Sequence, residues 1–184
     1  MPDNSRLQRH VGLAIAYSAW KFYESTGEIG YLVEEGAELI IQIARFVASL
    51  ATHDDTTDRY DIAGVMGPDE FHDGYPDAPG EGLRNNAYTN VMAAWVMLRA
   101  VDVVNVLSPR YADQMWNRIR LRPGEVKQWR LIGSRLRVPF HADGVISQFE
   151  GYERLKEFDW AGYRARYGAI GRLDLILAAE GDTS

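Results

Sequence analysis

"AYTNVMAAWVMLRAVDVVNV", residues 87–106, is the stretch that decides the fold, because winding it into a helix leaves it no polar face. Charged side chains occur only at Arg99 and Asp102. A helix that is apolar on every side is stable where other elements cover every side. We therefore expect residues 87–106 to form a central helix with other helices packed around it.

Periodic apolar residues on both sides of this stretch predict those surrounding helices. The first two are joined by a turn at Gly27 so short that they should pack as an antiparallel hairpin. Further along, Pro109, which follows Ser108, and Pro123 occupy positions typical of the first residue of a helix. We expect a mainly α fold, with helices over about 10–25, 30–50, 109–119, 123–136 and 173–181 and short strands over 60–66 and 145–149.

Composition narrows the class of protein. A length of 184 residues is that of one ordinary domain, and the net charge of −6 argues against a nucleic-acid partner. The absence of cysteine excludes disulfides and thiolate zinc sites. The first ten residues lack the apolar core of a secretory signal, and no stretch approaches the roughly 18 uncharged apolar residues needed to span a bilayer. We expect a cytoplasmic protein with no membrane partner.

A pair of carboxylates before the central helix carries the strongest chemical signal. Asp69 and Glu70 follow Gly67-Pro68 and are flanked by apolar residues. If those neighbours exclude water, burial raises the pKa of Glu70, and an ionised Asp69 raises it further. A carboxyl that holds its proton near neutral pH can protonate a leaving oxygen, so Glu70 is a candidate general acid.

Two other interpretations of this turn remain open on the residues alone. Neighbouring acids in a surface loop are most often solvated and have no catalytic role. Oxygen and imidazole ligands for a metal are also present in Asp69, Glu70, His72 and Asp73. Residues adjacent in sequence rarely converge on one ion without a defined loop, and the calcium-loop pattern is missing. We expect no metal here.

The motifs GPDEFH (67–72) and NNAYTN (85–90) resemble the catalytic signature of glycoside hydrolase family 65. That family contains inverting phosphorylases of maltose, trehalose, kojibiose and related α-glucosides. The similarity extends to residues 10–17 and 25–27 before the signature and to 144–152 after it. The resemblance implies part of an (α/α)6 barrel, two concentric rings of six helices, in which residues 87–106 suit the inner ring.

The resemblance also implies a reaction and a set of site residues. Glu70 would protonate the glycosidic oxygen while inorganic phosphate attacks the anomeric carbon from the opposite face, releasing β-glucose 1-phosphate. Phosphate is then a co-substrate, and no cofactor or metal is expected. An inverting hydrolase would instead need a second carboxylate, about 6.5–9.5 Å from the first, to activate water. The expected substrate-binding residues are Asp69, His72, Arg84, Asn85 and Asn86.

This sequence departs from the family pattern in two respects. The link over 73–84 is long, and Leu83-Arg84 stands where many members have Val-Asp. Arg84 could contact a phosphorylated or acidic aglycone, or it could pair with Glu81 at the surface. Residues 1–184 also resemble only the middle of the catalytic domain, without the N-terminal β-sandwich or the C-terminal part of the barrel. We therefore expect the isolated chain to be inactive and to self-associate through apolar faces.

Three functions remain as sequence-based hypotheses. The leading one is a segment of an inverting disaccharide phosphorylase. The second is an inverting hydrolase of the same family that uses water. The third is a non-catalytic carbohydrate-binding or scaffold remnant, against which the intact GPDE motif argues.

Overall fold

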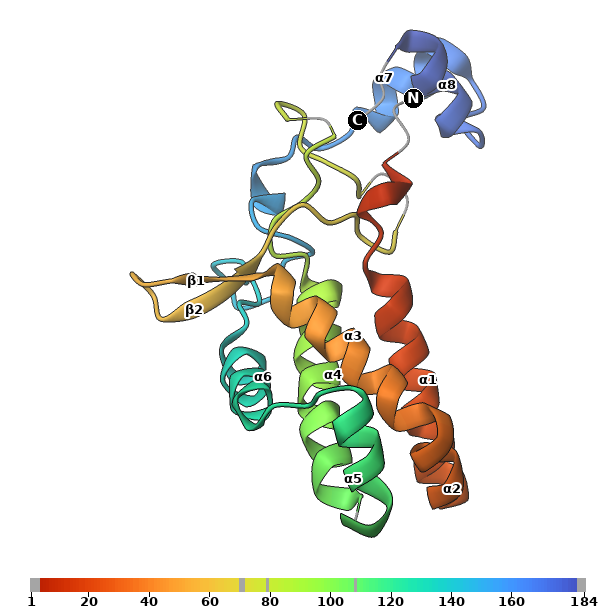
Figure 1. Ribbon diagram of the computed structural model, residues 1–184. Coiled ribbons are helices and arrows are strands. Elements are labelled where there is room, and N and C mark those ends of the chain that lie inside the picture. Colours follow the sequence, from red (N-terminus) through yellow and green to blue (C-terminus); the bar gives the residue numbers. More distant parts are fainter. Residues whose placement is uncertain (1–3, 70–71, 79, 108, 182–184) are drawn as a thin grey trace.

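The structure, a computed structural model, describes residues 4–69, 72–78, 80–107 and 109–181 (Figure 1). Two antiparallel strands, β1 (Ala51–Asp54) and β2 (Arg59–Ile62), form a hairpin in which Ala51 pairs with Ile62. The helices are α1 (His10–Thr26), α2 (Ile29–Tyr31), α3 (Ala37–Leu50), α4 (Ala87–Val106), α5 (Pro109–Arg118), α6 (Pro123–Arg135), α7 (Trp160–Tyr167) and α8 (Leu173–Glu180), and the strands are β1 (Ala51–Asp54) and β2 (Arg59–Ile62). The expected mainly α chain is confirmed.

Helix α4 is the centre of the packing, as its sequence predicts. It contacts α1, α3 and α6, and its buried side chains join those of the three neighbours in one apolar core. Helix α6 comes close to α4 at Gly133, where an added Cβ would lie 3.3 Å from the backbone oxygen of Ala94. By length and composition α4 could cross a bilayer, but these contacts identify it as a core helix.

The first helical hairpin also forms where the sequence predicts it. Gly27 ends α1 in the left-handed conformation that glycine adopts without strain, and the chain returns through α2 to α3, which packs on α1 (Figure 1). Between α2 and α3 the residues Leu32–Gly36 form one π-helical turn. The predicted helix over 30–50 is therefore continuous in direction but not in hydrogen-bond pattern.

The strand predictions were only partly right. Strand β2 ends at Ile62 rather than at residue 66, because Gly64 turns the backbone into the left-handed region two residues later. Beyond it, Val65 and Met66 make single bridges to Leu83 and Gln8. Residues 145–149 form no strand, since only Ile146 is bridged, to Phe140.

Two elements were not predicted from the sequence. No strand was expected where β1 lies, because its residues follow α3 directly, with no turn signal between the two elements. Helix α7 was missed because it is short and carries no buried residue. It is held beside α8 by contacts to one carboxylate, since Tyr163 and Arg166 donate to Glu180 at 2.5 and 2.7 Å. Both helices lie at the end of the molecule away from α5 (Figure 1).

Candidate active site

The acidic turn is closed at its base by backbone hydrogen bonds. The N–H of Gly67 donates to the carbonyl of His72 at 2.6 Å, and the N–H of Met66 donates to the carbonyl of Leu7 at 3.0 Å. Glu70, the expected general acid, and Phe71 lie outside the described residues. The turn therefore begins at Gly67 and ends at His72, where this hydrogen bond joins its two ends.

Gly67 is required at the start of this turn by close packing. A Cβ added there would lie 2.7 Å from Cβ of His72 and 3.0 Å from Nδ2 of Asn86. The first contact is closer than real Cβ atoms approach, so any side chain at residue 67 would push the two ends of the turn apart. Gly67 thus brings the acidic turn against the start of α4.

Asp69 and His72 flank the acid in different environments. The Asp69 side chain is 74% exposed, whereas that of His72 is 16% exposed, and Oδ2 of Asp69 lies 3.9 Å from Nδ1 of His72. Burial lowers the pKa of His72 below its ordinary value, although the negative charge of Asp69 acts in the opposite direction. His72 is therefore a neutral imidazole at neutral pH.

Asn85 is the centre of a buried polar network behind the turn. Its backbone is left-handed, at φ 50°, and its side chain is inaccessible to solvent. The amide nitrogen donates to Asp61 Oδ1 at 3.0 Å and to Glu150 Oε2 at 2.7 Å. The amide oxygen accepts from the N–H of Ile62 at 3.1 Å and from Nδ2 of Asn90 at 3.0 Å. Every hydrogen-bonding group of this side chain is therefore taken by protein.

Asp61 is the buried anion of this network and was not among the residues singled out from the sequence. It accepts from Nε of Arg137 at 2.6 Å and from the guanidinium of Arg84 at 2.5 Å, besides Asn85. Burial raises the pKa of Asp61, but the hydrogen bonds and positive charges of its partners outweigh this and hold the pKa below the ordinary value. Asp61 is thus a stable carboxylate that joins β2 to two distant loops.

Arg84 takes part in the same network instead of pairing with Glu81 as the sequence had suggested. Its guanidinium bonds Asp61, and its Nε lies 3.3 Å from Oε2 of Glu150. The side chain is 49% exposed, so one side of the guanidinium faces solvent. Its backbone is held too, because the N–H of Arg84 donates to the hydroxyl of Tyr75 at 3.1 Å.

Asn86 is the N-cap of α4. Its side-chain oxygen accepts from the N–H and the hydroxyl of Thr89, both at 3.0 Å, and its Nδ2 donates to the carbonyl of Gln148 at 3.3 Å. The helix cap is therefore supplied by Asn86 and not by its neighbour Asn85. One turn later, the buried Oδ1 of Asn90 has no hydrogen-bond partner among the described residues.

Of the sequence-predicted residues, the structure brings His72, Asn85 and Asn86 together and leaves Asp69 in solvent. Asp61, Arg137 and Tyr75 were missed, because they lie far apart in sequence and none stands in a recognisable motif. Within the described part of the chain, no three His, Asp or Glu side chains gather as metal ligands. What the network can do chemically is to hold β2, the loop at Glu150 and the start of α4 in one rigid unit.

Comparison with known families gives a match over the whole chain. Residues 1–184 match the glycosyl hydrolase family 65 central catalytic domain. A provisionally assigned kojibiose phosphorylase from the human microbiome has a related structure, with a TM-score of 0.67 and 17% sequence identity over 80% of this chain and 19% of that one. This likeness concerns the fold, and the expectation of part of an (α/α)6 barrel is confirmed.

Curated relatives are similar along almost the full chain. An uncharacterized glycosyl hydrolase of Mycobacterium tuberculosis is 54% identical over 99% of this chain and 14% of its own length. Trehalose 6-phosphate phosphorylase of Lactococcus lactis is 38% identical over 98% of this chain and 22% of its own length. The chain thus spans less than a quarter of the length of either relative.

Proposed function

The chain belongs to glycosyl hydrolase family 65, and we propose that it is a segment of the catalytic domain of an inverting α-glucoside phosphorylase. Similarity to trehalose 6-phosphate phosphorylase and to several kojibiose phosphorylases supports phosphorolysis as the reaction class. The substrates are then an α-linked disaccharide, or a phosphorylated one, and inorganic phosphate. The products are β-glucose 1-phosphate and the released aglycone.

Glu70 acts as the general acid in this proposal. An oxygen of phosphate forms a bond to the anomeric carbon while the glycosidic bond breaks. The electron pair of the glycosidic bond leaves with the aglycone oxygen, and Glu70 protonates that oxygen. The attack comes from the face opposite the leaving group, so the configuration inverts. The proton that hydrogen phosphate carries then restores Glu70. Phosphate arrives as an anion, so no second carboxylate is needed as a base.

One observation carries this proposal: the turn that contains Glu70 is closed at its base and locked to the start of α4. The hydrogen bond from Gly67 to His72 and the packing of Gly67 against Asn86 fix both flanks of the acid. A proton donor contributes to catalysis only when it is held within hydrogen-bond reach of the leaving oxygen. Asn85, Asp61 and Glu150 hold the segment that leads into α4, and in this proposal they act as positioning residues.

Asp69, His72, Arg84, Asn85 and Asn86 remain proposed substrate-binding residues, and their environments set what each can contribute. Asp69 and the open side of Arg84 can meet a ligand directly, since both are accessible to solvent. Asn85 and Asn86 use their side chains on protein partners, so they act on the ligand through the backbone they hold. For Arg84 the ligand would be an acidic or phosphorylated aglycone group.

The test is product analysis with the longer protein that contains this chain. Trehalose, kojibiose, maltose and trehalose 6-phosphate are each incubated with and without inorganic phosphate, and the anomer of the sugar product is determined by proton NMR. The proposal predicts β-glucose 1-phosphate from at least one of them, only when phosphate is present. Free glucose formed at the same rate without phosphate would contradict it and assign hydrolysis, the reaction named for the Mycobacterium relative.

A further inference from the structure

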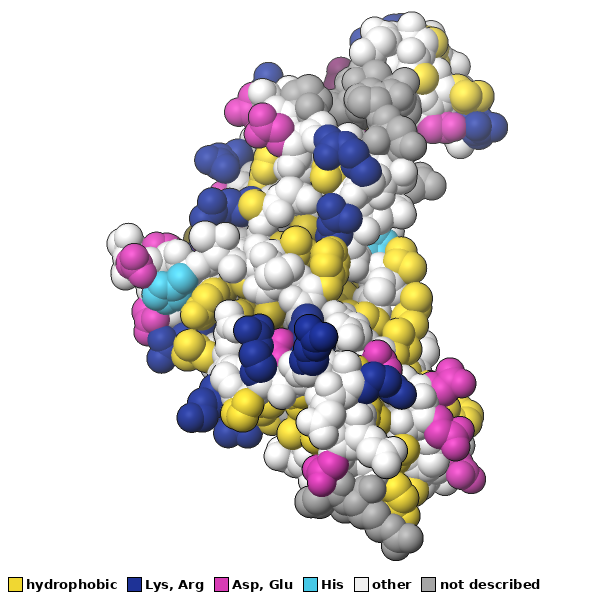
Figure 2. Space-filling view, in the orientation of Figure 1, with side chains coloured by type: hydrophobic (Ala, Val, Ile, Leu, Met, Phe, Trp, Pro, Cys, Tyr) yellow, Lys and Arg dark blue, Asp and Glu magenta, His cyan; other side chains and the backbone are white. Residues whose placement is uncertain are grey.

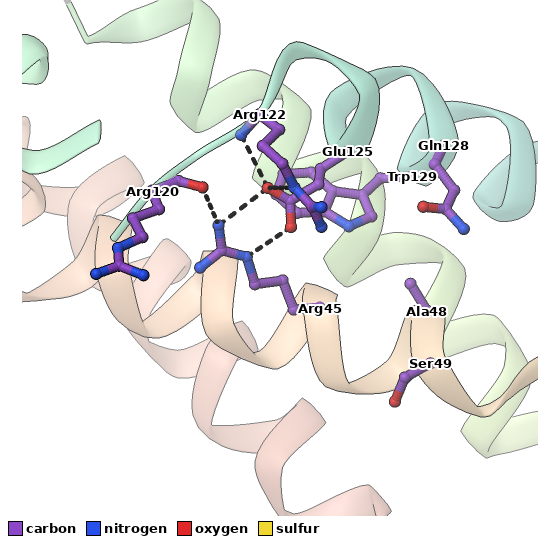
Figure 3. Close-up of a pocket in the computed structure, with 8 residues that line it drawn as sticks. All are labelled: Arg45, Ala48, Ser49, Arg120, Arg122, Glu125, Gln128 and Trp129. Carbon is purple, nitrogen blue, oxygen red and sulfur yellow. Dashed lines mark hydrogen bonds and ion pairs between the residues drawn. The ribbon is translucent and has the colours of Figure 1, made fainter. Parts of the chain in front are cut away.

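A hollow with charged and polar side chains in its lining lies between α3 and the start of α6, away from the acidic turn. Its volume is about 660 Å³, which is within the range of small-molecule sites. Arg45, Ser49 and Ala48 line it from α3, and Glu125, Gln128 and Trp129 line it from α6, with Arg120 and Arg122 on the connecting loop (Figure 3). None of these residues belongs to the network around Asn85.

The surroundings of the hollow are unusually basic for this chain. Residues 118–137 include only one acidic side chain, Glu125, in a protein whose net charge is −6. Figure 2 shows this excess as Lys and Arg side chains gathered over one face. The basic side chains of the segment are Arg118, Arg120, Arg122, Lys127, Arg130, Arg135 and Arg137.

Ion pairs compensate only part of this charge. Arg118 pairs with Glu38, Arg135 with Asp58 and Arg137 with Asp61. Arg120 has no ion pair with any described carboxylate, and Arg122 has one long contact, 3.8 Å from its Nε to Oε2 of Glu125. Both guanidinium groups therefore remain available to an anion.

The single carboxylate in the hollow is already neutralised. Arg45 donates from Nε and from one terminal nitrogen to the two oxygens of Glu125, at 2.8 and 3.0 Å, and both side chains are largely buried. Arg45 also donates to the carbonyl of Arg120 at 3.3 Å, which pins the loop in its left-handed turn at φ 51°. The Arg45–Glu125 pair thus builds the site and leaves a net positive charge of two at its rim.

The hollow has a charged end and an uncharged end. Figure 3 shows Arg120 at one end and Gln128 and Ser49 at the other, with the Arg45–Glu125 pair and Arg122 between them. The first turn of α6 is also here, and the partial positive charge of a helix N-terminus adds to that of the arginines. Guanidinium forks match phosphate oxygens, whereas Gln128 and Ser49 can hydrogen-bond hydroxyl groups.

We propose that this hollow binds a sugar phosphate, with its phosphate at Arg120 and Arg122 and its hydroxyl groups toward Gln128 and Ser49. The site is separate from the acidic turn and would act as a regulatory or substrate-retaining site on the outside of the catalytic segment. The inference does not depend on the proposed reaction, because it rests on charge, shape and hydrogen-bonding groups that the acidic turn does not share.

Titration of the protein with glucose 6-phosphate tests this site, with the indole N–H resonance of Trp129 as the local readout. Trp129→Phe assigns that resonance. We expect a saturable shift with a dissociation constant in the millimolar range or tighter and no shift with glucose. Arg120→Gln with Arg122→Gln should weaken binding by about tenfold or more, because two charge-assisted contacts are lost. Both residues are exposed, so the fold should be kept, which thermal unfolding checks.

The matched control is Lys127→Gln with Arg130→Gln, which removes two charges from the neighbouring helix α6 at residues that do not line this hollow. Affinity should stay within about twofold of the unmodified protein. Equal weakening by both pairs would assign the effect to the general field and overturn the proposal. The absence of a saturable shift, or equal affinity for sulfate and glucose 6-phosphate, would overturn it as well.

Discussion

At the scale of single residues, the most informative side chain is Asn85. It adopts a left-handed backbone that few residues other than glycine tolerate, and its side chain bonds four partners: two in β2, one in the loop at Glu150 and one in the first turn of α4. Asparagine suits this position for two reasons: it tolerates the left-handed region, and its amide both donates and accepts. The motif resemblance found Asn85 in the sequence, but its partners could not be predicted, because Asp61 and Glu150 approach it only after folding.

We predict that Asn85→Ala lowers the free energy of unfolding by roughly 3–5 kcal/mol, because it leaves buried polar groups unpaired and strains the left-handed backbone. Asn105→Ala, at an exposed position of α4, is the control and should change stability by less than about 0.5 kcal/mol. Urea denaturation of both variants measures the difference. A loss at Asn85 no larger than that at Asn105 would show that the network contributes nothing.

The lowered pKa of Asp61 leads to a prediction about how the stability of the fold depends on pH. Because its pKa in the folded protein lies below the ordinary value of 3.8, the carboxylate stabilises the fold above that pH, and this contribution is lost as the pH falls through the folded-state pKa. Asp61→Asn should therefore be less stable than the unmodified protein at neutral pH and should lose less stability on acidification. Denaturation measured from about pH 6 downward tests this. Parallel pH profiles of stability for Asp61→Asn and the unmodified protein would contradict it.

At the scale of elements, the start of α4 is a meeting point of several segments. Its N-cap residue, Asn86, packs against Gly67 of the acidic turn and donates to the carbonyl of Gln148. The sequence predicted α4 because an apolar run of this length has one stable placement, inside a ring of helices. It did not predict β1 or α7, which depend on tertiary contacts: β1 on its pairing with β2, and α7 on Glu180. The strand expected over 145–149 failed because those residues bond loops rather than a neighbouring strand.

Gly67→Ala tests whether the close approach between the turn and α4 matters. The added Cβ meets His72, so we expect the free energy of unfolding to fall by about 1–3 kcal/mol and turnover in the longer enzyme to fall as well. Gly12→Ala is the matched control, since its Cβ would meet nothing within 4 Å in α1, and it should stabilise the protein by about 0.5 kcal/mol. Equal behaviour of the two variants would mean that the turn is not tightly packed.

At the scale of the whole molecule, one helix face is apolar and open. Val11, Ile15 and Phe22 of α1 repeat at helical spacing and are each about half exposed, and Figure 2 shows hydrophobic side chains along that edge. Faces of this kind are usually covered in the functional protein. Composition alone could predict that apolar faces would exist, but their location required the packing of α1 on α3 and α4.

We predict that the 184-residue chain self-associates in a concentration-dependent manner through this face. Sedimentation velocity should show species larger than the monomer, and Ile15→Glu combined with Phe22→Glu should shift the population toward the monomer. Gln114→Glu combined with Asn117→Glu, which adds the same two charges at exposed positions of α5, should not. A monomer at every concentration would exclude the prediction.

The central claim is that Glu70 donates the proton to the departing sugar oxygen, and the turnover of Glu70→Gln in the longer enzyme tests it most directly. The amide of glutamine keeps the shape of the side chain but has no acidic proton that it can transfer to the leaving oxygen. We predict that the rate of phosphorolysis falls by about 10²–10⁴-fold, while disaccharide affinity stays close to that of the unmodified enzyme. Glu81→Gln, an exposed glutamate of the following loop, should retain full activity. Turnover of Glu70→Gln equal to that of Glu81→Gln would contradict the account.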